Sequence, residues 1–276
     1  MKKRISFQGK HGAYSDLACK KFFPALETLP CDTFEEALSA VKNDFTNLAL
    51  IPVENNIAGR VADMHFLLED IDLKIVAEHY FKIQHHLLGL HITSISKIRK
   101  VYSHVHALSQ CKKNLEKLAL QPVSYLDTAG AAEFVSKSND ATIAAISSKL
   151  ASDIYNLKIL KKNISDHVNN ITRFLVFAKK SVAVGIEKRV ITTIVFNTKN
   201  SPAALYKALG GFALNNINLT RLESFFVNKD FKQFSFLIDV ECHPDKSNFL
   251  KALNTLKNSS TRVKIIGFYE ASGFRK

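Results

Sequence analysis

The chain has 276 residues, of which 46% are hydrophobic and 23% charged, and its formal net charge is +13. This composition supplies the core of two or more globular domains and excludes a disordered chain, and no apolar run reaches the about 18 residues that span a bilayer. Lysine supplies 30 of the 38 basic residues and is spread along the sequence, so we expect neither a nucleic-acid partner nor a membrane contact.

The N-terminal residues and the cysteines predict a cytoplasmic location. Residues 1–4 are basic, but polar residues 8–12 stand where an export signal needs its apolar stretch. The four cysteines are Cys19, Cys31, Cys111 and Cys242. None belongs to a C-x-x-C pair, so we expect reduced thiols and neither a structural metal nor a disulfide framework.

Through the first 180 residues, short apolar strands alternate with helices, which is typical of a layered α/β structure. Ser15 is placed to cap a helix that starts at Asp16, and Thr33 with Glu36 forms a capping box for the next helix. The predicted strands are 5–7, 48–53, 73–76, 80–90, 100–103, 123–126, 141–146 and 171–177. The predicted helices begin near 16, 34, 106, 128 and 148, and one more carries Met64, Leu67 and Leu68.

Residues 179–188 lose this density of apolar residues and are predicted to be a linker. Beyond them the order changes to βαββαβ, with strands at 190–196, 219–226, 234–240 and 263–268. One helix is predicted to start at Pro202, and another carries Phe249. This is the ferredoxin-like layout, and its open sheet predicts pairing with a second subunit.

Polar clusters end several predicted strands and open the helices that follow. They are 12–15, 54–56, 103–104, 127–130 and 170–174. Each cluster is commonly no more than a helix cap. Helix N-termini also suit carboxylates, and ligands of open α/β sheets bind at the carboxyl ends of strands, so together these clusters predict a site for an anionic ligand.

Generic catalytic motifs are missing from the sequence: it has no G-x-G-x-x-G, P-loop, G-x-S-x-G or H-E-x-x-H. His104, His106 and Cys111 offer too few ligands at too wide a spacing for zinc. His85 and His86 lie in an apolar stretch and are interpreted as ordinary packing and surface residues.

In this order, the polar clusters resemble the prephenate dehydratase family. The matching segments are Phe7-Gln8-Gly9 with Gly12-Ala13-Tyr14-Ser15, Ile51 to Asn56, Val101-Tyr102-Ser103-His104, Gln110-Cys111, Asp127-Thr128-Ala129, and Asn170-Ile171-Thr172-Arg173-Phe174. The resemblance implies a two-lobed, periplasmic-binding-protein-like catalytic region over 1–180. Its lobes would be about 1–78 plus 165–180, and 79–164. It also implies a βαββαβ ACT regulatory domain over 189–276.

The resemblance implies a reaction without cofactors that converts prephenate into phenylpyruvate, water and carbon dioxide. Thr172 would donate a proton or a hydrogen bond to the departing hydroxyl. The substrate-binding residues would be Arg173, Asn55, Ser103, Thr128, Ala129, Phe174, Tyr14 and Ser15. A tight ion pair would oppose loss of the ring carboxylate, so we expect Arg173 on the side-chain carboxylate instead.

The tail of the chain resembles the ACT domain of this family, which implies a homodimer or tetramer. Its effector contacts would be Ala203, Ala204, Leu205, Asn216, Asn218, Leu219, Glu223 and Ser224. Ala203 replaces a Gly of the family and Phe225-Phe226 replaces Arg-Pro, which leaves L-phenylalanine control open. Val105 and His106 likewise replace Pro and Gln in the catalytic region.

Two other functions compete with prephenate dehydration. An arogenate dehydratase would need an acid, such as Glu54 or Asp127, in the cleft to meet the substrate's ammonium group. A non-catalytic amino-acid sensor could use the same two-lobed cleft, but Thr172 and Arg173 would then serve no leaving group.

Overall fold

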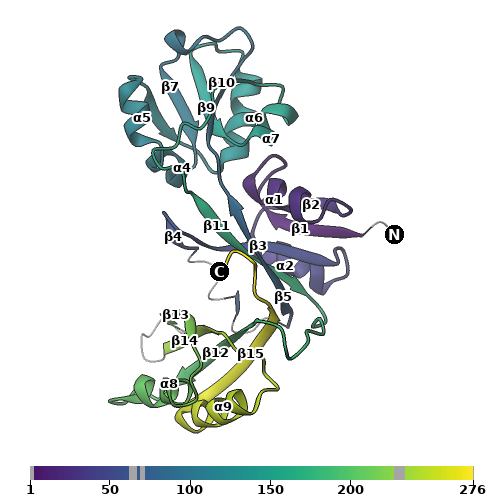
Figure 1. The fold of residues 1–276 in the computed structure, drawn as a ribbon. Coiled ribbons are helices and arrows are strands. Elements are labelled where there is room, and N and C mark those ends of the chain that lie inside the picture. The colour runs from purple at the N-terminus through teal and green to yellow at the C-terminus, as the bar shows by residue number, and fades with distance from the viewer. Residues whose placement is uncertain (1–2, 62–66, 69–71, 227–233, 276) are drawn as a thin grey trace. The chain divides into compact units, whose positions relative to one another are not determined.

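The computed structural model describes residues 3–61, 67–68, 72–226 and 234–275. Contacts divide the chain into two compact units (Figure 1): Met1–Val61 with Tyr80–Phe174, and Ala62–His79 with Leu175–Lys276. The chain passes from one unit to the other after Val61, within strand β5 (Lys74–Lys82) and within strand β11 (Ile171–Ala178). We call them unit 1 and unit 2. They are defined by contacts, whereas the predicted boundaries at 180 and 189 follow the sequence pattern.

The first lobe of unit 1 is an α/β layer built around strand β1. Its elements are β1 (Arg4–Gln8), α1 (Tyr14–Phe22), β2 (Glu27–Cys31), α2 (Phe34–Lys42), β3 (Leu48–Asn55), β4 (Gly59–Arg60) and the start of β11. Strand β1 pairs in parallel with both β2 and β3. Ile5, Phe7 and Leu50 are fully buried, as the apolar runs of a parallel sheet predict.

The second lobe of unit 1 holds a five-stranded sheet in the order β10-β6-β9-β7-β8. Its elements are β6 (His86–Gly89), η1 (Ile95–Lys97), β7 (Lys100–Ser103), α4 (Val105–Ser109), α5 (Lys112–Lys117), β8 (Gln121–Ser124), α6 (Thr128–Ser138), β9 (Ile143–Ser147), α7 (Lys149–Ile154) and β10 (Lys158–Lys161). One buried cluster includes Cys111 and Leu115, and another includes Ala131 and Val135. Strand β7 lies parallel to β8 and β9, so the loops after β7 and β8 leave the same edge.

Unit 2 has the predicted βαββαβ order. Its elements are β12 (Val190–Thr198), α8 (Ala204–Leu214), β13 (Leu219–Phe226), β14 (Phe234–Val240), α9 (Ser247–Ser259) and β15 (Ser260–Glu270). Strands β13, β14, β12 and β15 are neighbours in that order, and Phe196, Phe212 and Phe249 share the core beneath the two helices. Gly267 pairs with Ile75 of β5 so closely that a side chain there would collide with the Ile75 backbone.

Some local predictions are confirmed and others are corrected. The capping box is confirmed in part, because Glu36 N donates to Thr33 Oγ1 at 3.1 Å, but the Glu36 carboxylate accepts from Asp32 N instead of Thr33 N. Helix α1 starts at Tyr14 with Ala13 as N-cap, so Ser15 lies inside its first turn and caps nothing. Helix α8 starts at Ala204, two residues after Pro202.

The predicted strand 80–90 is broken into two, and the break matters for the site. Strand β5 ends at Lys82 and β6 begins at His86. Between them, Ile83 N donates to Asn170 O, and His85 O accepts from Ile164 N. The backbone of this segment therefore forms hydrogen bonds outside the β5 and β6 strand pairings. Of the predicted helix residues at 64–68, Met64 lies outside the described residues.

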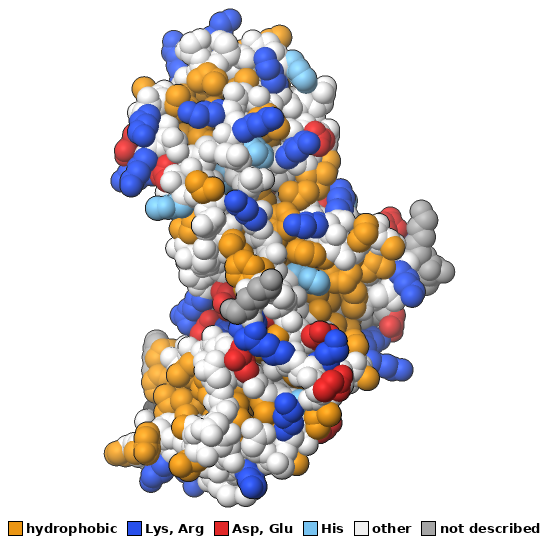
Figure 2. All heavy atoms as spheres, in the orientation of Figure 1, with side chains coloured by type: hydrophobic (Ala, Val, Ile, Leu, Met, Phe, Trp, Pro, Cys, Tyr) orange, Lys and Arg blue, Asp and Glu red, His pale blue; other side chains and the backbone are white. Residues whose placement is uncertain are grey.

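The basic side chains are dispersed on the face drawn in Figure 2. Among the described residues on that face, Lys and Arg are scattered between acidic and apolar side chains instead of forming a stripe. In the part of the chain that the structure describes, no helix is long and apolar enough to cross a membrane.

Candidate active site

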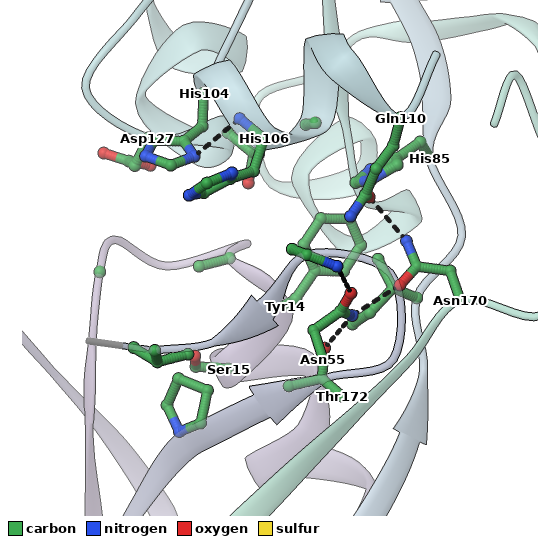
Figure 3. Close-up of a pocket in the computed structure, with 18 of the residues that line it drawn as sticks. Tyr14, Ser15, Asn55, His85, His104, His106, Gln110, Asp127, Asn170 and Thr172 are labelled. Carbon is green, nitrogen blue, oxygen red and sulfur yellow. Dashed lines mark hydrogen bonds between the residues drawn. The ribbon is translucent and has the colours of Figure 1, made fainter. Parts of the chain in front are cut away.

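A cavity of about 280 Å³ lies in unit 1 where strands of both lobes end (Figure 3). Residues at or just after the carboxyl ends of the strands line it: Gln8 at the end of β1, Asn55 at the end of β3, His104 after β7, and Asp127 after β8. Thr172, near the start of β11, completes this set. The convergence follows the rule that open α/β sheets bind ligands beyond the carboxyl ends of their strands.

Strand alternation in β11 decides which residues face the cavity. Thr172 and Phe174 line it, whereas Arg173 does not. Arg173 is only 1% exposed, and its Nη1 lies 3.3 Å from Glu54 Oε2. Successive side chains of a strand point to opposite faces, so the Arg173 side chain is turned away from the cavity, and the structure does not bring it to the substrate contact that was predicted for it.

Arg173→Met is expected to lower the free energy of unfolding by about 2–4 kcal/mol, because it removes a buried charge from its carboxylate partner. Since the Arg173 side chain does not line the cavity, KM for the substrate that the cavity takes should stay within about twofold of wild type. Urea unfolding and steady-state kinetics on the same samples measure both quantities. A tenfold rise in KM at unchanged stability would show instead that Arg173 binds the substrate.

Two further predicted substrate residues do not line the cavity. Ser103 is fully buried, and its Oγ donates to Ile146 O at 2.6 Å, which ties β7 to β9. Ala129 is fully buried in the first turn of α6. Of the remaining predicted residues, the cavity is lined by Tyr14, Ser15, Asn55, Thr128, Thr172 and Phe174.

Two helices begin at the cavity. Helix α1 has no side-chain cap at its N-cap residue, Ala13, whereas Asp127 caps α6 by accepting from Gly130 N at 2.7 Å. Gly12, just before α1, has a φ of +91°, and a Cβ there would lie 3.0 Å from Ala151 Cα. Because helix N-termini carry partial positive charge, the uncapped start of α1 favours an anionic ligand, whereas at α6 the Asp127 carboxylate already takes that place.

The Asn55 side-chain amide has one possible orientation. Its Oδ1 accepts from the backbone N–H groups of Ile57 and Ala58 at 2.9 and 2.8 Å. A backbone N–H can only donate, so Asn55 Nδ2 must face the other way, where it donates to Asn170 Oδ1 at 2.7 Å and lies 3.0 Å from Thr172 Oγ1.

This orientation decides what the Thr172 hydroxyl does. Thr172 Oγ1 accepts a hydrogen bond from Asn55, and its own hydrogen has no acceptor among the described residues. The side chain is 8% exposed and lines the cavity. Thr172 therefore presents a hydrogen-bond donor to a bound ligand.

The hydrogen bonds of Asn55 continue in a row through three further residues, whose side chains the sequence analysis did not place in the site. Asn170 Nδ2 donates to Gln110 Oε1 at 2.7 Å, and His85 Nε2 lies 2.8 Å from that oxygen. His85 Nδ1 lies 2.6 Å from the Tyr14 hydroxyl. The sequence signal was present, since Gln110 and Asn170 fall in matching segments, but His85 was interpreted as a packing residue.

The electrostatics of the cavity come from histidines and helix ends. Among the described residues that line it, none is Lys or Arg, and Asp127 is the acid. His85 and His104 both have pKa values lowered by burial, His85 to about 4. In the described part of the chain, no group of three or more His, Cys, Asp or Glu side chains is arranged to hold a metal ion.

The predicted effector residues all lie in unit 2. Ala203, Ala204 and Leu205 stand at the start of α8, and Ala203 has a left-handed φ of 61°. Asn216, Asn218 and Leu219 follow the other end of α8, and Glu223 and Ser224 lie on β13. Asn218 Nδ2 donates to Glu241 Oε2 at 3.1 Å, and Glu223 Oε1 accepts from Arg221 at 2.9 Å.

Comparison with known proteins identifies similar chains over nearly the full length. A family model described as prephenate dehydratase matches residues 5–182. A bifunctional N-acyl-homoserine lactone acylase/prephenate dehydratase of Komagataeibacter europaeus is 40% identical, covering 99% of this chain and 97% of the relative. Arogenate dehydratase/prephenate dehydratase 1 of Arabidopsis thaliana is 39% identical over 97% of this chain and 72% of its own length.

Two solved structures share the fold. GqqA, described as a novel type of quorum quenching acylase, superposes with a TM-score of 0.93 at 40% identity, covering 99% of this chain and all of the other. Prephenate dehydratase from Arthrobacter aurescens in complex with L-Phe gives a TM-score of 0.88 at 25% identity, covering 97% of this chain and 90% of that one.

Proposed function

The chain belongs to the prephenate dehydratase family and is a hydro-lyase, and from that premise we propose that the cavity around Thr172 converts prephenate into phenylpyruvate. The observation that carries this assignment is the outward hydrogen of Thr172, which Asn55 enforces by donating to its oxygen. A cavity of about 280 Å³ suits a small metabolite, since it lies near the small end of ligand pockets.

The reaction needs help chiefly at the leaving hydroxyl. As the bond between the ring and its carboxylate breaks, its electron pair moves into the ring and expels the hydroxyl on the opposite carbon. Carbon dioxide and hydroxide leave, the hydroxide becomes water on gaining a proton, and the ring becomes aromatic. A hydrogen bond that strengthens as negative charge develops on the departing oxygen lowers this barrier.

Thr172 supplies that hydrogen bond in this proposal. A threonine hydroxyl is too weak an acid to be ionised, so its contribution is a fixed hydrogen-bond donor to the leaving group. Asn55 holds the hydroxyl oxygen, and the backbone amides of Ile57 and Ala58 hold Asn55. The donor is thereby oriented before substrate arrives.

The two carboxylates of prephenate meet the N-terminus of α1 and imidazole groups instead of an arginine. The first turns of α1 and α6 reach the cavity, and His104 and His106 add imidazole groups from the start of α4. Helix dipoles and imidazole groups would bind a carboxylate without a buried arginine ion pair. That suits a group which must lose its charge when carbon dioxide leaves.

A direct assay tests this function. The purified chain should form phenylpyruvate from prephenate, followed by its absorbance in alkali, and activity should persist in a chelator. Release of homoserine lactone from an N-acyl-homoserine lactone is measured in parallel, because a relative carries both activities in its name. Prephenate that binds without turnover would favour the sensor function, and no binding would overturn the assignment.

Arogenate is the second candidate substrate, and Asp127 is the observation that favours it. Asp127 lines the cavity, whereas Glu54 pairs with Arg173 outside it. We expect Asp127→Asn to lower kcat/KM for arogenate relative to prephenate by about tenfold, which corresponds to about 1.4 kcal/mol. Asn caps helices as well as Asp, so α6 should remain intact. An unchanged ratio would show that Asp127 does not meet the ammonium group.

Unit 2 is proposed to be an ACT regulatory domain that pairs with a second copy. The predicted effector residues fall at both ends of α8, whose 11 residues span about 16 Å. One amino acid could contact both groups only between two copies of the chain. A related structure contains L-Phe, so L-phenylalanine is the effector to test, by equilibrium dialysis with the oligomeric state checked by light scattering.

Ala203→Gly is expected to raise the free energy of unfolding by about 0.5–1 kcal/mol, because Ala203 occupies a left-handed conformation that costs an alanine more than a glycine. Chemical unfolding measures the change. The matched control is Ala204→Gly, the same substitution one residue later in helical conformation, which should lower stability instead. Equal signs for the two variants would contradict the strain at Ala203.

A further inference from the structure

At the wall of the cavity, a row of side chains joins Tyr14 to Gln110 through His85, and all three residues line the cavity (Figure 3). His85 is 3% exposed and lies at the break between β5 and β6, with both ring nitrogens engaged. Its ring also meets the Tyr14 ring edge-on at 5.2 Å between centroids.

The direction of every hydrogen bond in this row follows from its far end. Asn55 donates to Asn170 Oδ1, so Asn170 Nδ2 is the group that donates to Gln110 Oε1. Gln110 Oε1 is therefore an acceptor, and His85 Nε2 must carry a hydrogen to approach it at 2.8 Å. That leaves His85 Nδ1 as an acceptor for the Tyr14 hydroxyl at 2.6 Å.

The protonation states agree with this direction. Burial lowers the pKa of His85 to about 4, so the ring is neutral near pH 7 and carries one hydrogen. Burial also raises the pKa of Tyr14, so its hydroxyl keeps the hydrogen that it donates. The Tyr14 hydroxyl also lies 3.1 Å from Gln84 O, so Gln110 Oε1 is the group that requires hydrogen on His85 Nε2, and Tyr14 supports that tautomer by donating to Nδ1, its nearer acceptor.

Gln110 lines the cavity at one end of this row. Its Oε1 accepts from His85 and Asn170, so its NH2 group is left for the cavity that the residue lines. If the amide rotated by half a turn, its NH2 would face two other donors. Two donors at one oxygen therefore fix which end of Gln110 a ligand meets.

We propose that His85, held in one tautomer by the hydrogen bonds at both of its ring nitrogens, is a positioning residue that keeps the Gln110 amide turned with its NH2 toward the substrate. This inference rests on the proposed function of the cavity. It assigns His85 no contact with substrate, and it predicts that the whole kinetic effect of His85 passes through Gln110.

A double-mutant cycle tests the proposal. His85→Leu removes the donor at similar volume and should lower kcat/KM for prephenate about 10- to 30-fold, the usual effect of one lost oriented hydrogen bond. In a Gln110→Ala background, the same substitution should change kcat/KM by less than about twofold. His85→Gln, which returns a donor near the position of Nε2, should recover part of the loss.

The controls separate positioning from damage to the fold. His86→Leu changes the neighbouring buried histidine, which accepts from Asn163 N outside the cavity, and should leave kcat/KM near wild type. Tyr14→Phe is the milder variant if His85→Leu does not fold. It should raise the fraction of the other imidazole tautomer, read from ¹⁵N chemical shifts, and lower kcat/KM in wild type but not in Gln110→Ala.

Three outcomes would overturn the proposal. They are equal losses for His85→Leu in both backgrounds, wild-type activity of His85→Leu, or a ¹⁵N spectrum of wild type with hydrogen on Nδ1. The assay of the wild-type protein distinguishes failure of this proposal from failure of the proposed function. If the wild type is active and the effects of the two substitutions are additive, only the role of His85 is disproved. A wild type without prephenate turnover removes the function on which that role rests.

Discussion

Thr172→Val should lower kcat for prephenate by about 10²–10⁴, the loss typical of one positioned donor at a developing charge. Valine keeps the shape of the side chain and removes only the hydroxyl. Asn55 Nδ2 would still have Asn170 Oδ1 at 2.7 Å and Ile171 O at 3.2 Å as acceptors. The hydrogen bonds that run from Asn55 through Asn170 should therefore be kept. Substrate affinity and the free energy of unfolding are therefore expected to change far less than kcat.

The control for this prediction is Thr172→Ser, which restores the hydroxyl without the methyl group. It should retain kcat within about tenfold of wild type, because the donor remains while its rotamer is less restricted. Stopped assays of phenylpyruvate give kcat, and thermal unfolding shows that the three proteins are equally folded. A fully active Thr172→Val enzyme would show that a residue other than Thr172 donates the hydrogen bond to the leaving group.

The sequence predicted the fold because its signals are local and repeated. The apolar run of β3 and the capping box at Thr33 are each read from a few neighbouring residues, and each forms its element in the structure. The order βαββαβ in unit 2 followed in the same way. Where the local signal was ambiguous, the prediction failed: Ser15 could cap a helix only if the helix began two residues later than α1 does.

The candidate site was less predictable, because its geometry depends on which face of a strand each residue occupies. Thr172 and Arg173 are adjacent in sequence and equally polar, yet strand pleating turns one toward the cavity and the other toward Glu54. His85 was missed for a related reason. Its partners, Tyr14 and Gln110, are 71 and 25 residues away, and no local pattern indicates such contacts.

The fixed direction of the hydrogen bonds gives the second large prediction. Asn55→Asp should lower kcat by about 10²–10³, because a carboxylate accepts and cannot donate to Thr172. The backbone amides of Ile57 and Ala58 would still hold one carboxylate oxygen. The other oxygen would take the Thr172 hydrogen for itself, and the departing hydroxyl would lose its donor.

Asn56→Asp is the matched control, since it adds the same charge one residue away. Asn56 also contacts the strand β11 region, with Oδ1 accepting from Ile171 N at 2.8 Å and Nδ2 donating to Asn169 O at 2.7 Å, but no contact joins it to Thr172 among the described residues. Both variants should raise KM for a dianion, whereas only Asn55→Asp should suffer the large fall in kcat. Equal kcat values for the two aspartates would mean that charge, and not the direction of the Asn55 hydrogen bond, sets the rate.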